Sequence, residues 1–149
     1  MKKLFIFLIT VTLFISCKKE PVDYTEIDED IIKQYISDHN LTAVATGTGL
    51  YYVINTPGTG TQPNGQSTVT VAYKGSLTDG SVFDESSNVG ITFGLTGVIK
   101  GWQEGIPYFK EGGSGILLIP SALGYGEQAT SGIPANSVLI FDVALIDVQ

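Results

Sequence analysis

The sequence predicts an antiparallel α+β domain of short strands around one short helix, preceded by a further helix near the N-terminus. Three observations support this. The 18 glycines indicate many tight turns, and Val, Ile, Thr and Tyr are frequent. From Gly49 on, apolar residues alternate with a period of two. A length of 149 residues suits one compact domain and a short extra segment.

The N-terminus has the features of an export signal. Lys2 and Lys3 form a positive start, and Leu4 to Ile15 is an apolar run shorter than the ~20 residues that cross a bilayer. Residues 14–17, Phe-Ile-Ser-Cys, resemble a bacterial lipoprotein box, in which the cysteine becomes the lipidated N-terminus. We expect a signal peptide over residues 1–16, a lipid on Cys17, membrane attachment through it, and a location at the bacterial cell envelope. The alternative is an ordinary signal peptide with a stray thiol.

Residues 17–46 are expected to form a lipidated tether followed by a helix over residues 28–39. Thr25 and Asp28 match a capping box at the helix start. An apolar stripe at helical spacing comprises Ile27, Ile31, Ile32, Tyr35 and Ile36. The stripe either packs on its own domain or forms a surface for a second copy or a client protein, so an oligomer formed through this helix stays open.

The remaining chain, residues 47–149, shows strand and turn patterns. Predicted strands cover residues 50–55, 68–76, 81–84, 91–95, 115–120 and 137–148. Turns are predicted at residues 57–60, 79–80 and 112–113, where glycine is frequent. One short helix is predicted within residues 98–108, and Pro107 helps to end it.

The residue inventory excludes several kinds of function. The net charge is −7 and the chain has no arginine, so we expect no nucleic-acid partner. His39 is the only histidine, and it falls in the predicted N-terminal helix, away from the remaining domain, so no Ser-His-Asp or Cys-His arrangement can be built. Cys17 is the only cysteine, so there is no His/Cys cluster for a metal. Residues 112–115, Gly-Gly-Ser-Gly, lack the Lys-Ser/Thr of a phosphate-binding loop. We therefore expect no metal and no cofactor.

A series of short motifs between Val71 and Val143 is more informative. The motifs are Val71-Ala72-Tyr73-Lys74-Gly75, Asp79-Gly80-Ser81-Val82-Phe83-Asp84-Glu85-Ser86, Val98-Ile99-Lys100-Gly101-Trp102-Gln103-Glu104-Gly105, Glu111-Gly112-Gly113, Ile119-Pro120, Gly124-Tyr125-Gly126, Ile133-Pro134-Ala135-Asn136-Ser137 and Leu139-Ile140-Phe141-Asp142-Val143. In this order they resemble the FKBP-type peptidyl-prolyl cis/trans isomerases. The resemblance implies a five-to-six-stranded antiparallel sheet wrapped around one short helix, with a pocket between them.

The resemblance also implies the residues of that pocket. The apolar walls are expected to be Tyr73, Phe83 and Phe141, and the floor is expected to be Trp102. Val98 and Ile99 are expected to form the rim, where the Ile99 N–H is a donor, and the Tyr125 hydroxyl is the second polar group. Asp84 is expected to be the one acid, and Ile133 and Ile91 are expected to complete the lining. Ile91 falls roughly where the family often has an aromatic residue.

The implied activity is rotation of X–Pro bonds in secreted or envelope proteins, which assists their folding and makes proline-containing polypeptides the partners. The alternative is a module that binds proline-containing segments, as a chaperone does, with little catalysis. A third interpretation, an acidic β-rich lipoprotein with a structural role, does not explain why the pocket residues occur together.

Two departures from the family pattern concern Asp84. The segment between Asp84 and Phe93 is short, and the arginine that commonly partners this acid is absent. Lys74 follows Tyr73 directly, so on a strand its side chain points to the opposite face. We therefore expect tyrosine hydroxyls and backbone donors to hold Asp84.

Overall fold

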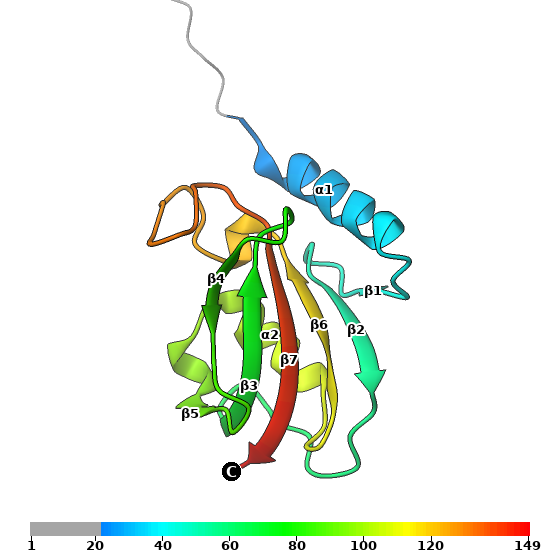
Figure 1. Ribbon diagram of the computed structural model, residues 1–149, viewed down its shortest axis with the longest axis vertical. Helices are drawn as coiled ribbons and strands as arrows, with labels where there is room; N and C mark the ends of the chain where they lie inside the picture. The colour runs from blue at the N-terminus through cyan, green and yellow to red at the C-terminus, as the bar shows by residue number, and fades with distance from the viewer. Residues whose placement is uncertain (1–21) are drawn as a thin grey trace, which may run out of the picture.

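A computed structural model describes residues 22–149, so the expected signal peptide and Cys17 lie outside the described residues (Figure 1). In chain order the elements are α1 (Tyr24–Asp38), β1 (Val44–Ala45), β2 (Tyr51–Thr56), β3 (Thr68–Ser76), β4 (Val82–Glu85), β5 (Ile91–Gly94), η1 (Leu95–Gly97), α2 (Lys100–Gly105), η2 (Ile106–Tyr108), β6 (Ser114–Ile119), η3 (Ser121–Leu123) and β7 (Leu139–Val148), where η marks a single 3₁₀ turn.

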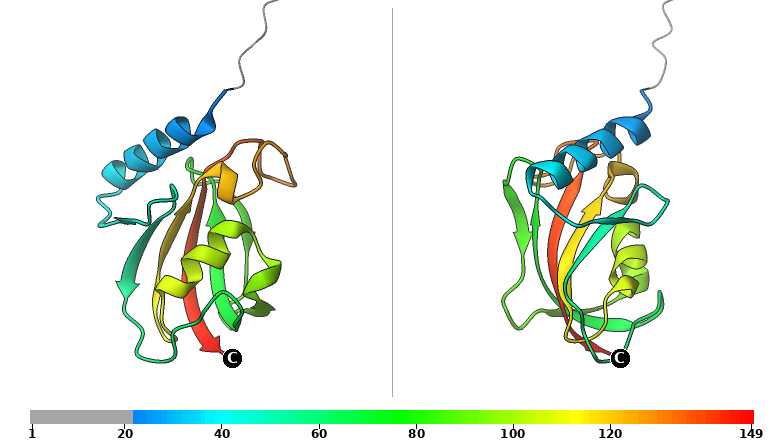
Figure 2. Two further views of the ribbon diagram at one scale, coloured as in Figure 1. Left: turned by 180° about the vertical axis from the view of Figure 1, so that it is seen from behind. Right: turned by 90° about the vertical axis from the view of Figure 1, so that its right-hand side faces the viewer.

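Within the described residues, seven antiparallel strands form one sheet. The order is β1-β2-β6-β7-β3-β4, and β5 also pairs with β3. One edge of β3 pairs with β7, and the other edge pairs with two strands, its first half with β5 and its second half with β4. Figure 2 shows α2 across one face of the sheet, which bends toward it. The predicted α+β class, with a sheet around one short helix, is confirmed. The strand β1 was not among the predicted strands, because its two residues are too few to show an alternating pattern.

Two glycines allow α2 to lie close against β6. A Cβ added at Gly101 would lie 2.4 Å from Ile119 Cγ2, and one at Gly105 would lie 2.6 Å from Leu117 Cδ2. Both contacts are shorter than side chains tolerate, so only glycine permits this spacing. The close approach places Trp102, which is 4% exposed, in the main core, the apolar cluster that also contains Leu117, Ile119 and Phe141. The helix thereby becomes the support for the floor of a cavity.

The outer face of the sheet is apolar under α1 and polar beyond it. Ile32 of α1 is fully buried in a second apolar cluster with Val53, Leu118 and Ile140. Two residues after Ile140, and on the same face, Asp142 lies in an open polar groove. In Figure 1, α1 crosses the upper ends of β2, β6 and β7, where the apolar half lies. Helix α1 therefore covers only that part of the outer face on which the strands present apolar side chains.

The apolar stripe of α1 is only partly used in this packing. Tyr35 and Ile36 pack with Ile32 against the second cluster, which confirms for these three residues that the stripe packs on its own domain. Ile27 and Ile31 remain 40% and 38% exposed. Among residues 22–149 there is no helix with both the length and the apolar character needed to cross a membrane.

The start of α1 differs from the prediction. The helix begins at Tyr24, and Asp23 is its N-cap, with Asp23 Oδ1 accepting a 2.9 Å hydrogen bond from the Thr25 N–H. The capping box predicted from Thr25 and Asp28 is therefore wrong. The carboxylate of Asp28 faces the domain and is 1% exposed. An Asp that caps from just outside the helix and one that lies on its buried face look alike in sequence.

Candidate active site

An apolar cavity of about 430 Å³ lies beside α2 and the strands β3 and β5. Its lining contains eight of the ten pocket residues expected from the sequence, and two others: Tyr73, Asp84, Ile91, Val98, Ile99, Trp102, Tyr125 and Phe141, with Phe93 and Gly97. These residues come from β3, β4, β5, the segment before α2, α2 itself, the loop after η3, and β7. The curved sheet thus brings together residues that are far apart in the sequence.

Aromatic rings form the floor and the inner wall of this cavity. The ring of Trp102 meets the ring of Tyr73 edge-on, with centroids 5.1 Å apart and an interplanar angle of 89°. Phe141 meets Trp102 in the same way, at 5.2 Å and 83°. Edge-to-face contacts of this kind fix ring orientation. The three rings thus hold one another in a fixed mutual orientation at the base of the cavity.

Phe83 and Ile133 are not among the residues that line this cavity, but both pack close to it. The Phe83 ring packs edge-on against Phe141, with centroids 5.5 Å apart. Gly75 makes room for this pair, because an added Cβ would lie 2.5 Å from the Phe83 ring and 2.8 Å from the Phe141 ring. Ile133 is 5% exposed and belongs to the main core. Phe83 thus contacts the lining through Phe141, and Ile133 contributes to the core.

Phe93 is a lining residue that the sequence interpretation did not include. It lies two positions after Ile91 on β5, so both side chains point to the same face. Its ring centroid is 5.3 Å from that of Trp102, whereas Ile91 is 46% exposed. The aromatic group expected near Ile91 is therefore that of Phe93. The period of two within β5 was the signal that could have revealed it.

Asp84 is held by a tyrosine. The Tyr73 hydroxyl donates a 2.6 Å hydrogen bond to Asp84 Oδ2. Burial, and then this bond and the negative charge of Asp84, raise the pKa of Tyr73 to about 12. No lysine of the described segment lies within ion-pair distance of Asp84. The pair therefore keeps the Tyr73 hydroxyl occupied as a donor.

The rim of the cavity offers free donors. Ile99 is the N-cap of α2, and its carbonyl accepts the Trp102 N–H at 3.0 Å and the Gln103 N–H at 3.2 Å. The Gln103 side chain also donates to the Val98 carbonyl, at 2.7 Å. Within residues 22–149 the Ile99 N–H has no hydrogen-bond acceptor. The backbone of the rim is thus fixed while one N–H stays available to a carbonyl at the cavity mouth.

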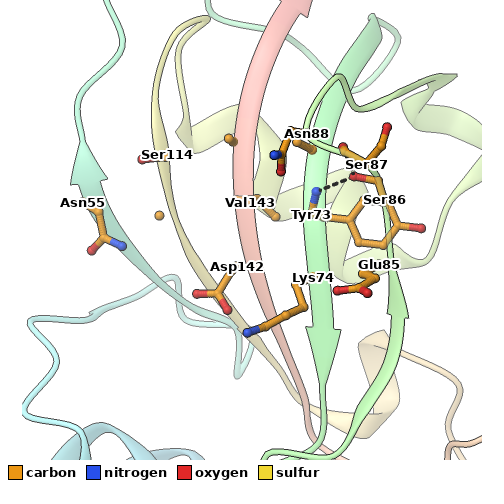
Figure 3. A pocket seen from close by; sticks show the side chains of 13 residues that line it. Asn55, Tyr73, Lys74, Glu85, Ser86, Ser87, Asn88, Ser114, Asp142 and Val143 are labelled. Carbon is orange, nitrogen blue, oxygen red and sulfur yellow. Dashed lines mark hydrogen bonds between the residues drawn. The ribbon is translucent and has the colours of Figure 1, made fainter.

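A second cavity, also of about 430 Å³, lies on the outer face of the sheet (Figure 3). Its side chains are largely polar or charged, among them Lys74, Glu85 and Asp142. Figure 3 shows Lys74 extending toward Asp142. Lys74 lines this groove and is not among the residues that line the aromatic cavity, as its position next to Tyr73 on the strand predicts. Ligand-binding pockets are mostly apolar with a few polar groups, and this groove is largely polar. The aromatic cavity is therefore the better candidate site.

The chemistry available in the aromatic cavity is binding and desolvation. In the described part of the chain, no group of three or more His, Cys, Asp and Glu residues is arranged to hold a metal ion. The cavity offers one carboxylate engaged by a tyrosine, one free backbone N–H and several aromatic faces. This combination suits an apolar ring next to an amide carbonyl.

Comparison with known proteins agrees with this geometry. The family model described as FKBP-type peptidyl-prolyl cis-trans isomerase matches residues 59–146. FkpA of Escherichia coli K12, named an FKBP-type peptidyl-prolyl cis-trans isomerase, is 47% identical over 106 residues, which cover 70% of this chain and 39% of that protein. A probable FkpA of Neisseria meningitidis is also 47% identical over 106 residues, with 69% and 39% covered. The chain thus spans about two fifths of the length of these curated relatives.

Solved structures show the same similarity. The crystal structure of Escherichia coli FkpA superposes with a TM-score of 0.74 and 38% identity, covering 85% of this chain and 61% of that one. A peptidyl-prolyl cis-trans isomerase of Pseudomonas syringae gives a TM-score of 0.72 and 30% identity, covering 89% and 98%. The matched segment includes the cavity residues from Tyr73 to Phe141. The chain therefore belongs to the FKBP-type peptidyl-prolyl cis-trans isomerase family.

Proposed function

We propose that this protein accelerates the cis/trans rotation of X–Pro bonds in polypeptides that enter the aromatic cavity. The observation that carries the proposal is the floor of packed aromatic rings around Trp102, with a free Ile99 N–H at the rim. The proline ring would rest on the indole, and the preceding carbonyl would accept the Ile99 N–H. The cavity then surrounds the amide whose rotation is catalysed.

The energies involved favour desolvation over hydrogen bonding as the main source of catalysis. Rotation crosses a barrier of about 18–20 kcal/mol. A turnover of about 10 per second requires that barrier to fall by roughly 4 kcal/mol. Removing an amide from water costs about 2–7 kcal/mol, and the planar amide, which is the more polar form, loses more than the twisted one. One hydrogen bond adds only about 0.5–1.5 kcal/mol net. Shape complementarity and desolvation therefore contribute more to the lowering of the barrier than a hydrogen bond does.

The test is refolding of a client whose slow phase is limited by a trans-to-cis proline, which lasts tens of seconds without a catalyst. We expect the intact chain to shorten that phase in proportion to its concentration, and Trp102→Ala to lose most of the effect. Lys74→Ala, in the outer groove, is the matched control and should act as the parent does. An intact chain that binds a proline peptide but leaves the slow phase unchanged supports the alternative, a binding module with little catalysis.

We further propose that the clients are secreted or envelope proteins and that a lipid on Cys17 holds the protein at the membrane. The support is in the sequence: a positive start, an apolar run over residues 4–15 and a cysteine at the end of a lipoprotein-like box. An isomerase held at that place would meet chains that are still folding. Oligomerisation through α1 also stays a prediction. Ile27 and Ile31 are the exposed apolar residues available for contact with a second copy, and sedimentation velocity of Ile31→Glu against the parent tests it.

A further inference from the structure

A buried hydrogen-bonded pair joins α1 to the turn that follows β6. Asp28 is 1% exposed and Ser121 is 3% exposed, although 93 positions separate them. Asp28 Oδ2 accepts hydrogen bonds from the Ser121 N–H at 2.7 Å and from the Ser121 hydroxyl at 2.6 Å. Hydrogen bonds to a buried carboxylate are short and strong, and they fix both partners. The first residue of η3 is therefore fixed by a side chain of α1.

The same serine holds the segment that carries Tyr125. The Ser121 carbonyl accepts the Gly124 N–H and the Gly126 N–H, both at 2.9 Å. These glycines flank Tyr125, which lines the aromatic cavity and is 43% exposed. Gly126 has a φ of +59°, which turns the chain back toward Ser121. A continuous series of contacts thus runs from Asp28 through Ser121 to the rim of the cavity.

We propose that Asp28 is a positioning residue for substrate binding: it fixes Ser121, and Ser121 fixes Tyr125 at the cavity rim. The N-terminal helix then contributes to the affinity of a site that it does not touch. Without the carboxylate, the Ser121 N–H and hydroxyl are left buried and unpaired, so the turn has to shift to find new acceptors. The expected effect of Asp28 on the affinity for X–Pro segments rests on the proposed function. The coupling between Asp28 and Tyr125 is independent of that function.

The geometry supplies a conservative variant. Both hydrogen bonds end on the same oxygen, Oδ2, while Oδ1 is buried and has no partner among the described residues. The single amide oxygen of Asn can occupy the place of Oδ2 and accept both bonds. Its NH₂ then lies buried without an acceptor in the place of Oδ1, so Asp28→Asn should lower stability while it keeps both bonds to Ser121. We therefore expect Asp28→Asn to preserve the position of Tyr125 and Asp28→Ala to lose it. Ile32→Ala is the matched control, because it removes a fully buried side chain four positions later on α1 and leaves the Ser121 contacts intact.

The experiment compares these three variants with the parent, using the intact chain. For Asp28→Ala we expect KM for a proline peptide to rise roughly three- to tenfold, with kcat changed less than about twofold, in the range found for couplings between non-contacting residues. Asp28→Asn should restore KM to within about twofold of the parent, the effect of a preserved contact. Ile32→Ala should lower the melting temperature at least as much as Asp28→Ala and leave KM unchanged.

Amide hydrogen exchange of Gly124 and Gly126 gives a readout that needs no catalysis. It should accelerate in Asp28→Ala, and not in Asp28→Asn or Ile32→Ala. If the parent binds proline peptides without isomerising them, the same comparison is made with the peptide Kd, so loss of the proposed activity and loss of the coupling are told apart. The proposal is overturned if Ile32→Ala raises KM or Kd as much as Asp28→Ala does. It is equally overturned if exchange at the two glycines is unchanged in folded Asp28→Ala.

Discussion

The Tyr73 hydroxyl and the Asp84 carboxylate are joined by a 2.6 Å hydrogen bond beside the aromatic cavity, and the lysine nearest in sequence, Lys74, lies on the other face of the sheet. Tyr73 is thus the group that stabilises this acid in the described structure. Its hydroxyl is occupied, so the Ile99 N–H and the Tyr125 hydroxyl are the rim groups left to meet a ligand carbonyl. Three predictions below depend on this division of roles.

The first prediction concerns titration of Tyr73. We expect its phenol to titrate with a pKa of about 12, above the ordinary value of 10, because burial and Asp84 both favour the neutral form. Asp84→Asn removes the charge but not the burial, so the pKa should fall and remain above 10. Tyrosine Cζ shifts measured by NMR across this range test both statements. A Tyr73 pKa that does not change in Asp84→Asn would contradict the pairing.

This shift also fixes the sign of one pH effect on stability. The folded-state pKa lies above the unfolded value, so the neutral phenol stabilises the fold below pH 10, and that contribution is lost as the pH rises through about 12. The denaturation midpoint of the parent should therefore fall across this window more steeply than that of Tyr73→Phe, which has no phenol there.

The second prediction is that Asp84→Leu lowers kcat/KM only modestly, by roughly three- to tenfold, the effect of losing one net hydrogen bond of 0.5–1.5 kcal/mol. Rotation about an X–Pro bond transfers no proton, so the acid orients Tyr73 and does not react. The refolding assay, run beside a melting curve, measures the change. Complete loss of acceleration in a folded variant would show that the carboxylate takes a direct part.

The strands were predictable from the sequence, and several side-chain positions were not. β3 spans Thr68–Ser76 as predicted, because the local alternation of a strand is present in the sequence itself. The packing of the Phe83 ring against the Phe141 ring depends on the missing Cβ of Gly75, a contact between three strands. A local pattern carries no information about such packing.

The role of Asp28 shows the same limit over a longer range. In sequence it matched a helix cap, but its partner is 93 residues away. Family motifs located most of the cavity lining because they fix several elements at once. They gave no information about α1, which precedes the first motif, nor about Phe93, which lies between two motifs.

The third prediction tests the close packing of α2. Replacing Gly by Ala inside a helix ordinarily stabilises a protein by about 0.4–1 kcal/mol. In Gly101→Ala the new methyl group would lie 2.4 Å from Ile119 Cγ2, so overpacking of about 1–3 kcal/mol should outweigh the propensity gain. We expect a lower melting temperature and, because Trp102 is the next residue, a lower kcat/KM. Gly97→Ala, where an added Cβ meets nothing within 4 Å, is the control for stability.

The fourth prediction concerns the lipid anchor. Cys17→Ser removes the thiol that would carry the acyl chains, so the protein should leave the membrane fraction or remain unprocessed. Fractionation of cells and mass determination of the released chain measure this outcome. If the variant and the parent partition alike, lipidation at Cys17 is wrong, and the apolar run over residues 4–15 belongs to an ordinary signal.

The last prediction separates desolvation from hydrogen bonding. Tyr125→Phe deletes a rim donor worth about 0.5–1.5 kcal/mol and should lower kcat/KM by at most roughly tenfold. Phe141→Ala opens the wall beside Trp102 to water and should lower it further. Phe83→Ala should also lower kcat/KM by more than the loss of one hydroxyl does, because the Phe83 ring packs edge-on against the ring of Phe141.

Truncating a buried aromatic residue can itself cost about 3–5 kcal/mol of stability, so the comparison has to be made on folded protein. Circular dichroism and melting curves recorded at the assay temperature identify the usable variants. The slow refolding phase then gives the rates, and its concentration dependence separates weaker binding from slower rotation. If desolvation dominates, the order of losses is Phe141→Ala, then Phe83→Ala, then Tyr125→Phe. If Tyr125→Phe no longer accelerates refolding while Phe141→Ala still does, desolvation is not the main source of catalysis, and the mechanism depends on the tyrosine hydroxyl.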